Sequence, residues 1–240
     1  MNYFFITGTS RGIGKALTEI LLSEKSNVVY GISRTDSIHD PNYQHFQIDL
    51  NDLDSVKNFK FPEIENAQSF VLVNNSAYED EVTHLGKKNN NDIIASTNVN
   101  YVAPAILMNN FIRTYQSDNC KRIILNISTG AAHRPIESWG TYCASKAALY
   151  MLSEVIDIEQ KLKNNDNPIR IFSVGPGVVD TKMQTKLRQV SHENFSQVNT
   201  FIEYFEKGQL AKPADVAKKL LQIINSPEKF EKVTFSVKDF

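Results

Sequence analysis

Tyr142 and Lys146 are the pair of side chains in this sequence with the clearest capacity for acid–base chemistry. A spacing of four residues puts the phenol and the ammonium on one face of a helix, one turn apart. A phenol has a pKa near 10 in water, and working near neutral pH requires it to fall by about three pH units, or roughly 4 kcal/mol. A nearby ammonium in a site shielded from water can supply that difference. Such a phenol can give a proton to a carbonyl oxygen while hydride adds to the carbon.

The position of this pair in the chain supports a chemical role. With nine tyrosines in the chain, the probability that one Tyr-x-x-x-Lys pattern occurs by chance is about one half. This one begins a helical pattern a short loop after the apolar run 123–127, and the hydroxyls of Ser128 and Thr129 follow that run directly. Hydroxyl donors beside a tyrosine are suited to hold a carbonyl oxygen. We therefore interpret these four residues as candidate catalytic residues.

The sequence TGTSRGIG at 7–14 has the spacing of a phosphate-binding turn. It follows the apolar run 3–6 and opens a helical pattern, which is the context that such a turn requires. Gly8 allows a sharp turn, Gly12 lets the backbone approach a pyrophosphate, and Gly14 lets the helix pack closely on the strand. The helix N-terminus offers free N–H groups to phosphates. These features predict a dinucleotide site that also includes Ser10, Arg11 and Ile13. The alternative is a glycine-containing loop that binds no ligand.

The end of the second expected strand indicates which dinucleotide is bound. An NAD site usually has an acid there, which accepts hydrogen bonds from the ribose 2′-hydroxyl. This chain has Ser33-Arg34, and the first acid stands two positions further on. Arg34, with Arg11 from the glycine turn, could bind a 2′-phosphate through charge-assisted bonds, so we predict NADP (NADPH) rather than NAD. Both arginines could instead be ordinary surface residues. Asp49-Leu50, after the third strand, could meet the adenine, although Asp49 could equally be a plain helix cap.

Short β-branched and aromatic runs alternate with longer helical patterns along the chain. This alternation predicts an α/β fold with a single Rossmann-type, doubly wound parallel sheet of about seven strands and helices on both faces. Crossovers should be right-handed, and the ligand should lie at the carboxyl ends of the strands. No linker or repeat divides the chain, so we expect one domain over residues 1–240. The expected strands are 2–7, 28–33, 44–48, 69–74, 121–127, 168–174 and 232–237, and the expected helices are 12–23, 51–58, 90–115, 141–163, 180–189, 196–206 and 213–225.

Composition excludes several classes of function. The net charge of −1 provides no basic field for nucleic acid or anionic membranes. No run of about eighteen apolar residues exists to span a bilayer, and strand-like sequence from residue 2 leaves no room for a targeting peptide. Cys120 and Cys143 are too few for a disulfide framework and have no metal-ligand spacing, so we expect no metal site. A cytoplasmic protein that acts on a small molecule is the expectation.

Motifs along essentially the whole chain resemble those of the short-chain dehydrogenase/reductase family. The matching segments are TGTSRGIG at 7–14, NNSA at 74–77, NVN at 98–100, NISTG at 126–130, YCASK at 142–146 and GPGVVDTKM at 175–183. This resemblance implies Tyr142 as proton donor, Lys146 as its modulator and ribose contact, and Asn100 as the residue that holds a proton-relay water. The family's substrate-orienting serine, thirteen residues before its tyrosine, corresponds to Thr129, with Ser128 beside it.

The resemblance also extends the expected cofactor site. Ala77 stands where the family usually has glycine, which would narrow the floor beneath the cofactor. Pro176, Gly177 and Val179 would flank the nicotinamide, and Thr181 would bond its carboxamide. Asn75 and Ser76 complete the cofactor-binding residues that the resemblance implies.

A narrower resemblance, to the branch with sepiapterin reductases and bacterial benzil reductases, indicates the substrate. It rests on the segment 126–149, which includes Trp139, on VDTKMQ at 179–184 and on KGQLAKPADVAKKLL at 207–221. Sepiapterin reductases anchor the pterin with an aspartate near the carboxyl end, where this chain has Thr234. We therefore expect an NADPH-dependent carbonyl reductase of a ketone or diketone. The expected substrate lid contains the aromatic residues Phe195, Phe201, Tyr204 and Phe205, which favours an aromatic substrate. Sepiapterin-like pterin reduction is the alternative, and a non-catalytic NADP-binding regulator is the alternative of a different class.

The family resemblance further implies a homodimer. Family members commonly pair through the two long helices, here 90–115 and 141–163, at a two-fold interface. Leu149, Leu152 and Val155 provide apolar surface on the second helix for such pairing.

Overall fold

The computed structural model describes residues 1–163 and 167–240, which form a seven-stranded parallel sheet in the order β3-β2-β1-β4-β5-β6-β7. The register is set in the centre, where Phe5 of β1 lies between Tyr30 of β2 and Leu72 of β4. Central strands such as β4 are buried along their whole length, which explains their continuous apolar sequence. The strands are β1 (Asn2–Thr7), β2 (Asn27–Ser33), β3 (Tyr43–Gln47), β4 (Ser69–Asn74), β5 (Lys121–Ile127), β6 (Arg170–Gly175) and β7 (Thr234–Ser236).

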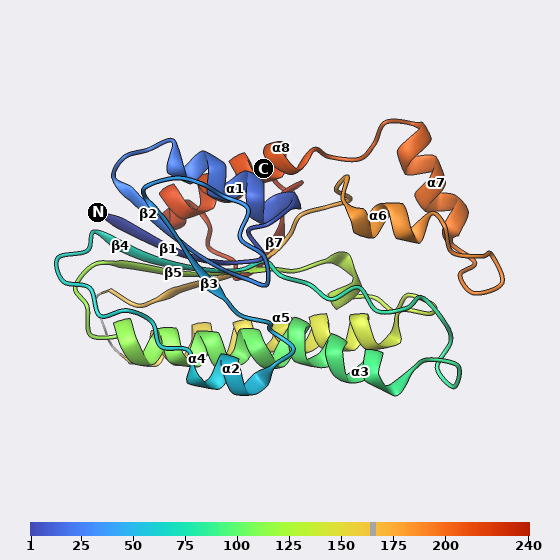
Figure 1. Cartoon of the computed structure of the whole chain (residues 1–240), viewed down its shortest axis with the longest axis horizontal. Helices are drawn as coiled ribbons and strands as arrows, with labels where there is room; N and C mark the ends of the chain where they lie inside the picture. The colour runs from blue at the N-terminus through green and yellow to red at the C-terminus, as the bar shows by residue number, and fades with distance from the viewer. Residues whose placement is uncertain (164–166) are drawn as a thin grey trace.

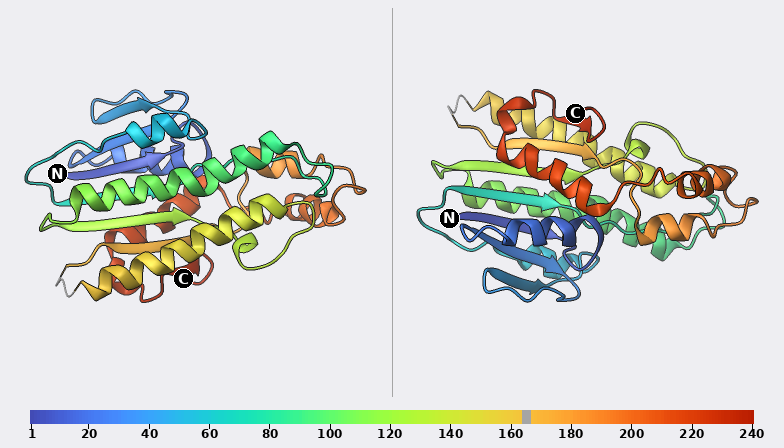
Figure 2. Two further views of the ribbon diagram at one scale, coloured as in Figure 1. Left: turned by 90° about the horizontal axis from the view of Figure 1, so that it is seen from below. Right: turned by 90° about the horizontal axis from the view of Figure 1, so that it is seen from above.

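Helices cover both faces of the sheet, as the sequence predicted (Figure 1). α1 and α8 lie side by side on one face, and α2, α4 and α5 cover the other (Figure 2). Two apolar cores result, one on each face of the sheet. The helices are α1 (Gly12–Leu22), α2 (Leu53–Asn58), α3 (Asn90–Thr97), α4 (Ala103–Tyr115), α5 (Gly140–Leu162), α6 (Lys182–Leu187), α7 (Val198–Glu206) and α8 (Pro213–Asn225).

The order of the strands decides where a ligand can bind. From β1 the chain moves outward to β2 and β3, returns to β4 and then continues in the opposite direction to β7. The loops after β1 and β4 therefore diverge to opposite faces and open a crevice at the carboxyl ends of these strands. α6 and α7 project beyond this edge of the sheet, at the right of Figure 1 in orange.

One expected helix is interrupted. The segment 90–115 is not a single α-helix, because a π-helical turn at Asn98–Val102 separates α3 from α4. The α-helical pattern of the sequence continues through this turn, so periodicity alone did not reveal it. A π turn inside a helix widens the ring of backbone hydrogen bonds locally and often marks a functional position. The remaining elements agree with the expected ranges to within two residues at each end.

The outer face of α5 carries an exposed apolar stripe. Its members recur every three or four residues, as one helix face requires, and are Met151, Val155, Ile158 and Leu162. Of the three residues expected to be available for pairing, Val155 belongs to this stripe. Leu149 is buried in the core and Leu152 packs against it, so for these two residues the expectation was wrong. The helix turns them toward its own sheet. Among the described residues, every helix is too short or too polar to cross a lipid bilayer.

Candidate active site

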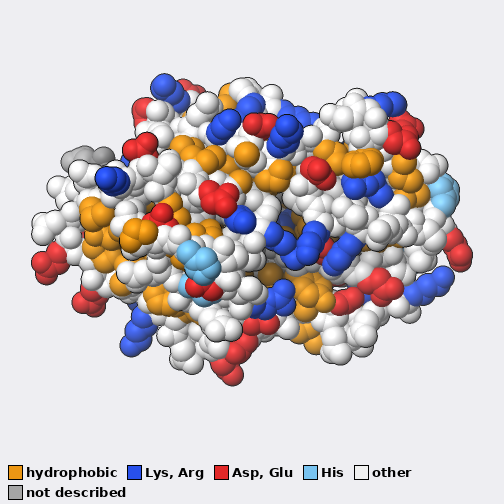
Figure 3. Space-filling model, turned by 45° about the horizontal axis from the view of Figure 1, so that its top comes forward, with side chains coloured by type: hydrophobic (Ala, Val, Ile, Leu, Met, Phe, Trp, Pro, Cys, Tyr) orange, Lys and Arg blue, Asp and Glu red, His pale blue; other side chains and the backbone are white. Residues whose placement is uncertain are grey.

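A cleft of about 1100 Å³ lies at the carboxyl ends of the strands. The glycine turn after β1 and the exits of β2, β4, β5 and β6 form its walls, with α6 along one side. Figure 3 shows a hollow near the middle of the molecular face, with Lys and Arg side chains gathered at its rim. Of the residues expected at the site, all line this cleft except Gly14 and Asn100.

The glycine turn has the conformation that its sequence predicted. Gly8 and Gly12 have φ values of 75° and 61°, in the left-handed region that side chains disfavour. A Cβ atom on Gly14 would lie 2.3 Å from the carbonyl oxygen of Gly8, so this glycine is required for packing between helix and strand. The neighbouring Asn75 donates hydrogen bonds from Nδ2 to the carbonyl oxygens of Thr7, at 2.9 Å, and of Gly8, at 3.2 Å. The turn is therefore fixed from two sides.

This turn fits the diphosphate of a dinucleotide. A Cβ on Gly12 would meet nothing closer than the Thr181 Cγ2 atom at 3.8 Å, so the backbone is open to the cleft. Arg11, at the start of α1, makes no side-chain cap to the first N–H groups of the helix. Uncapped N–H groups at a helix N-terminus are suited to donate hydrogen bonds to phosphate oxygens.

Ser33, Arg34, Asp49 and Leu50 line the end of the cleft beyond the glycine turn. Arg34 is exposed there. Arg11 is half exposed and lies 4.0 Å from Glu79, a weak contact. Asp49 is not the helix cap considered above, because its carboxylate accepts from Asn51 N in a turn and α2 is capped by Asp52.

A hydrogen-bonded chain that sequence reasoning missed connects the glycine turn to the end of β2. The Tyr43 hydroxyl lies 2.8 Å from the Thr9 hydroxyl and 3.0 Å from His45 Nδ1, and His45 Nε2 lies 3.0 Å from the Ser33 carbonyl oxygen. The tyrosine ring crosses Gly31, where a Cβ would come within 1.9 Å of its hydroxyl. Gly31 interrupts the apolar run of β2, and that interruption is the one sequence signal of this close approach.

At the other end of the cleft, Tyr142 and Lys146 lie on the same face of α5, both buried. Lys146 donates from Nζ to the Ile127 carbonyl oxygen at 2.9 Å, and burial lowers the pKa of its ammonium to about 8. Burial raises the pKa of Tyr142 well above its ordinary value, and a hydrogen bond with Thr129 offsets part of that rise. The expected lowering by the ammonium is therefore not what this geometry gives, because loss of solvation outweighs every favourable contact.

The two hydroxyls after β5 differ in their surroundings. Thr129 lies close enough to Tyr142 to lower the pKa of the phenol, and its Oγ1 atom accepts from Ala131 N at 3.3 Å. Ser128 is held by its backbone N–H, which donates to the Val174 carbonyl oxygen at 2.8 Å. Its Oγ atom is buried and has no partner among the described residues. The structure thus brings Thr129, and not Ser128, into contact with the tyrosine.

Asn100 lies in the π turn, beneath the cleft rather than in its wall. Its Oδ1 accepts from Tyr78 N at 2.8 Å, and its Nδ2 donates to the Tyr78 carbonyl oxygen and to Ser96 Oγ, each at 3.2 Å. The side chain is fully buried and is used to hold the segment after β4. These contacts are with the protein framework, and Oδ1 keeps a second lone pair that can accept from a water. The role of Asn100 in holding a relay water stays a prediction.

The segment after β6 forms the wall opposite β5. Pro176, Gly177, Val179 and Thr181 all line the cleft. Gly177 has a φ of 75°, and Thr181 begins α6 without capping it, which leaves its hydroxyl available to a ligand. Ser76 and Ala77 line the floor, where the backbone N–H of Ser76 donates to the Thr7 hydroxyl at 3.0 Å.

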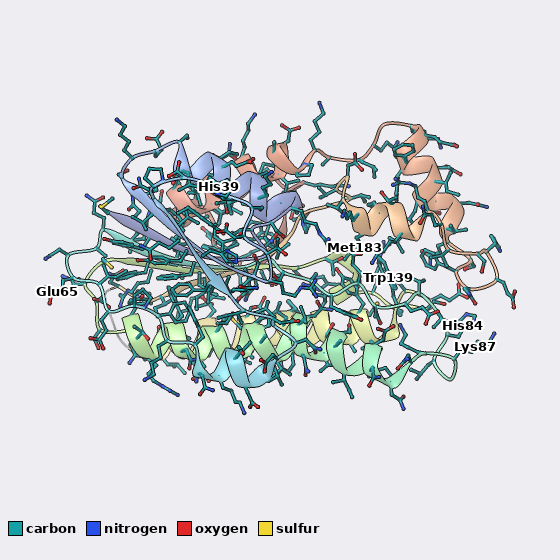
Figure 4. All side chains as sticks on the ribbon, in the orientation of Figure 1. His39, Glu65, His84, Lys87, Trp139 and Met183 are labelled. Atoms are coloured by element: carbon teal, nitrogen blue, oxygen red, sulfur yellow. The ribbon has the colours of Figure 1, made fainter. Side chains whose placement is uncertain are left out.

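An aromatic pocket adjoins Tyr142. Trp139, Phe195 and Phe201 pack together with Leu187 of α6, and Met183 packs against them. Figure 4 shows Met183 on the underside of α6, near Trp139, which lies between α6 and α5. Of the four aromatics expected in the lid, Phe201 lines the cleft and Phe195 is fully buried behind it. Phe205 is exposed, with the Arg188 guanidinium 4.3 Å from its ring centre, so it does not belong to the pocket.

Comparison with known proteins agrees with this architecture. The profile of the short chain dehydrogenase family matches residues 2–192. The chain is 31% identical to benzil reductase ((S)-benzoin forming) of Bacillus cereus, which covers 95% of this chain and 96% of the relative. The corresponding protein of Bacillus subtilis (strain 168) is 30% identical and covers both chains in full. Sepiapterin reductase of Rattus norvegicus is 28% identical, over 91% of this chain and 89% of the relative.

Solved structures show the same fold. A short chain dehydrogenase/reductase from Saccharomyces cerevisiae superposes with a TM-score of 0.81 at 22% identity, covering 99% of this chain and 96% of that one. 4-Hydroxyisoleucine dehydrogenase complexed with NADH gives a TM-score of 0.76 at 20% identity, covering 98% and 96%. Fold, motifs and relatives together establish that the chain belongs to the short chain dehydrogenase/reductase family, in the branch of the benzil and sepiapterin reductases, and is an oxidoreductase of C=O or CH–OH groups that uses a nicotinamide cofactor.

Proposed function

We propose that this protein is an NADPH-dependent carbonyl reductase that reduces an aromatic ketone or diketone, with Tyr142 as the proton donor. The observation that carries the proposal is that Tyr142, Thr129 and the buried Lys146 all line one end of the cleft, with Thr129 close enough to Tyr142 to lower the pKa of the phenol. These groups end the same cleft that begins at the glycine turn. A carbonyl oxygen placed against the two hydroxyls would therefore lie in reach of a cofactor extended along the cleft.

The cofactor would be held along the whole length of the cleft. The diphosphate would lie on the glycine turn, at Gly8, Ser10, Gly12 and Ile13, with Gly14 behind them. The 2′-phosphate would be bound by Ser33 and Arg34. Asp49 and Leu50 would contact the adenine. The floor of the cleft would be formed by Asn75, Ser76 and Ala77, and the segment 176–181 would contact the nicotinamide. Bound NADPH supplies the hydride that reduces the carbonyl carbon. The preference for NADPH rests on the two arginines of the cleft, Arg11 and Arg34, because each is exposed and neither is held by a strong ion pair.

The protein's own groups supply the proton. Tyr142 keeps its proton at neutral pH because burial raises its pKa, so it is a donor in the direction of reduction. The tyrosinate that remains is stabilised by Lys146 when that side chain is protonated, and by the hydroxyl of Thr129. Asn100 acts as a positioning residue through its bonds to Tyr78. The hydride adds to the carbonyl carbon and the proton to the carbonyl oxygen, so the product is an alcohol.

The pocket beside Tyr142 favours an aryl substrate. Trp139, Phe201 and Met183 provide apolar surface, and burial of an aryl group contributes roughly 25 cal/mol per Å². Two of the relatives are named benzil reductases, and benzil is an aryl diketone whose phenyl rings suit the apolar side chains of this pocket.

Reduction of a pterin ketone is the second candidate, and one observation favours it. Thr234 lines the cleft and donates from Oγ1 to Glu154 Oε1 at 2.8 Å. A carboxylate is therefore present behind Thr234: it belongs to Glu154 of α5. It is occupied by the threonine, so a pterin would have to displace that hydroxyl, and we rank the diketone first.

We also propose a homodimer, supported by the exposed apolar stripe on α5. A cytoplasmic location and a single domain over residues 1–240 stay predictions from the sequence. A non-catalytic NADP-binding regulator would have no need of the buried lysine beside Tyr142, so this alternative is the weaker one.

A substrate panel tests the proposal. NADPH absorbance is followed with benzil, sepiapterin and a simple aldehyde, each with the unmodified protein and with Tyr142→Phe. We expect benzil to have the highest kcat/KM and the variant to lose at least a hundredfold in turnover while NADPH binding, measured by fluorescence, persists. A tenfold preference for sepiapterin would favour the pterin reading, and a Tyr142→Phe protein with most of its activity would exclude Tyr142 as the donor.

A further inference from the structure

Gln184 is a buried polar residue in the wall of the cleft for which the cofactor and the acid–base groups give no role. It lies on the inner face of α6, one turn before Leu187, and is only 7% exposed. Its side chain lines the cleft, yet its Oε1 atom has no hydrogen-bond partner among the described residues. A buried polar atom without a hydrogen-bond partner costs free energy, and folded proteins contain few such atoms.

Two other residues of α6, next to Gln184 and one turn beyond it, belong to an apolar cluster. The neighbour Met183 and the next turn of the helix, at Leu187, pack into the cluster of Trp139 and Phe201. Packing alone would favour leucine or methionine at position 184, because either would fill the site without a buried amide. An unpaired polar group in the apolar pocket next to the reacting tyrosine is the arrangement that orients a ligand.

A vicinal diketone has a polar atom for this amide. One of its carbonyl oxygens accepts from the Tyr142 and Thr129 hydroxyls, and the other has no donor in that pair. A glutamine amide has a donor end and an acceptor end, and a half-turn about its last bond exchanges them. The N–H group can therefore face a carbonyl without any movement of α6.

We propose that Gln184 is a specificity-determining residue that donates a hydrogen bond to the second, unreduced oxygen of a 1,2-dicarbonyl substrate. The proposal rests on the proposed function and deepens it, because it names the substrate class as vicinal dicarbonyls rather than aryl ketones in general. It also fixes the orientation of the substrate. The carbonyl bound to Gln184 is held away from Tyr142, so the first product is the α-hydroxyketone.

Two aryl ketones that differ by one oxygen test the proposal. Benzil has both carbonyls, and deoxybenzoin has a methylene in place of one of them. The variant is Gln184→Met, which keeps the length of the side chain and removes the amide. The matched control is Gln189→Met, at an exposed glutamine just beyond the same helix. For each protein, kcat/KM is measured with both ketones and Tm without ligand.

For Gln184→Met we expect kcat/KM for benzil to fall at least tenfold and that for deoxybenzoin to change less than twofold. Tm should stay the same or rise, because the variant removes an unpaired buried amide. The control should change neither the ratio of the two ketones nor Tm. A structural glutamine would behave differently, since its loss would lower Tm and affect both ketones alike.

Three results would overturn the proposal. An unchanged ratio of benzil to deoxybenzoin in Gln184→Met, in a protein that reduces both, refutes the role of Gln184 and leaves the proposed function intact. Collapse of that ratio in Ser128→Ala but not in Gln184→Met assigns the second oxygen to the unpaired Ser128 hydroxyl instead. An unmodified protein that binds NADPH and reduces neither ketone refutes the proposed function, and the substrate class named here with it.

Discussion

The buried ammonium of Lys146 makes the stability of this protein depend on pH in a direction that can be calculated. Burial lowers the pKa of Lys146 from 10.5 to about 8, and the side chain is only 3% exposed, so solvent screening is weak. At 1.36 kcal/mol for each tenfold change in the equilibrium, holding the proton in the folded state costs about 3 kcal/mol. The unfolded chain binds this proton more tightly than the folded one. Stability therefore rises with pH between about 8 and 10.5.

Lys146→Met isolates this effect, because the variant has no proton to hold at this position. We expect the free energy of unfolding of the unmodified protein, relative to that of Lys146→Met, to increase by about 2 to 3 kcal/mol from pH 7 to pH 10. Both proteins are unfolded with urea at a series of pH values, and the difference is plotted against pH. Titrating groups that do not interact with Lys146 cancel in that difference.

Lys25→Met is the control, since Lys25 is exposed and makes no side-chain ion pair among the described residues. Its difference curve should be flat to within about 0.5 kcal/mol. A flat curve for Lys146→Met as well would refute the reasoning, because it would mean that Lys146 keeps its ordinary pKa inside the fold. If Lys146→Met also lost activity while its difference curve stayed flat, Lys146 would be needed for catalysis although burial does not shift its pKa.

Four further predictions concern the cleft and the assembly. Arg34→Asp should invert the preference from NADPH to NADH, measured as the ratio of kcat/KM, because a carboxylate repels a 2′-phosphate and suits a 2′-hydroxyl; equal rates with both cofactors in the unmodified protein would contradict this. Thr129→Val should lower kcat at least tenfold and Ser128→Ala less, since Thr129 contacts Tyr142, and the reverse order would transfer the role to Ser128. Tyr43→Phe removes the link between Thr9 and His45 and should weaken NADPH binding about three- to tenfold by fluorescence titration without loss of Tm beyond a few degrees; unchanged affinity would leave the link without a role in the cofactor site. Light scattering at micromolar protein should give the mass of a dimer, and a strictly monomeric mass would reject the pairing of α5.

The sequence was sufficient for the features that depend on local geometry. The glycines at 8, 12 and 14 require particular backbone angles and a close approach, and the structure has both. The alternation of apolar runs and helical patterns led to the seven parallel strands in their observed places, because burial on both faces of a sheet leaves a continuous apolar sequence. The four-residue spacing of Tyr142 and Lys146 was enough to put them on one helix face.

Features that depend on contacts between distant segments had no such local signal. The π turn at Asn98–Val102 serves Asn100, whose partner Tyr78 is 22 residues away, and the helical period is the same on both sides of it. The pKa of Tyr142 is governed by how deeply the surrounding loops bury it, and this reversed the expectation drawn from Lys146 alone. The unpaired amide of Gln184 became visible only once α6 was folded over the cleft. Sequence therefore determined the order of the elements, the glycine turn and the identity of the reacting groups. The π turn, solvation and the partners of each polar atom were decided by tertiary packing, because they depend on what the rest of the chain brings into contact.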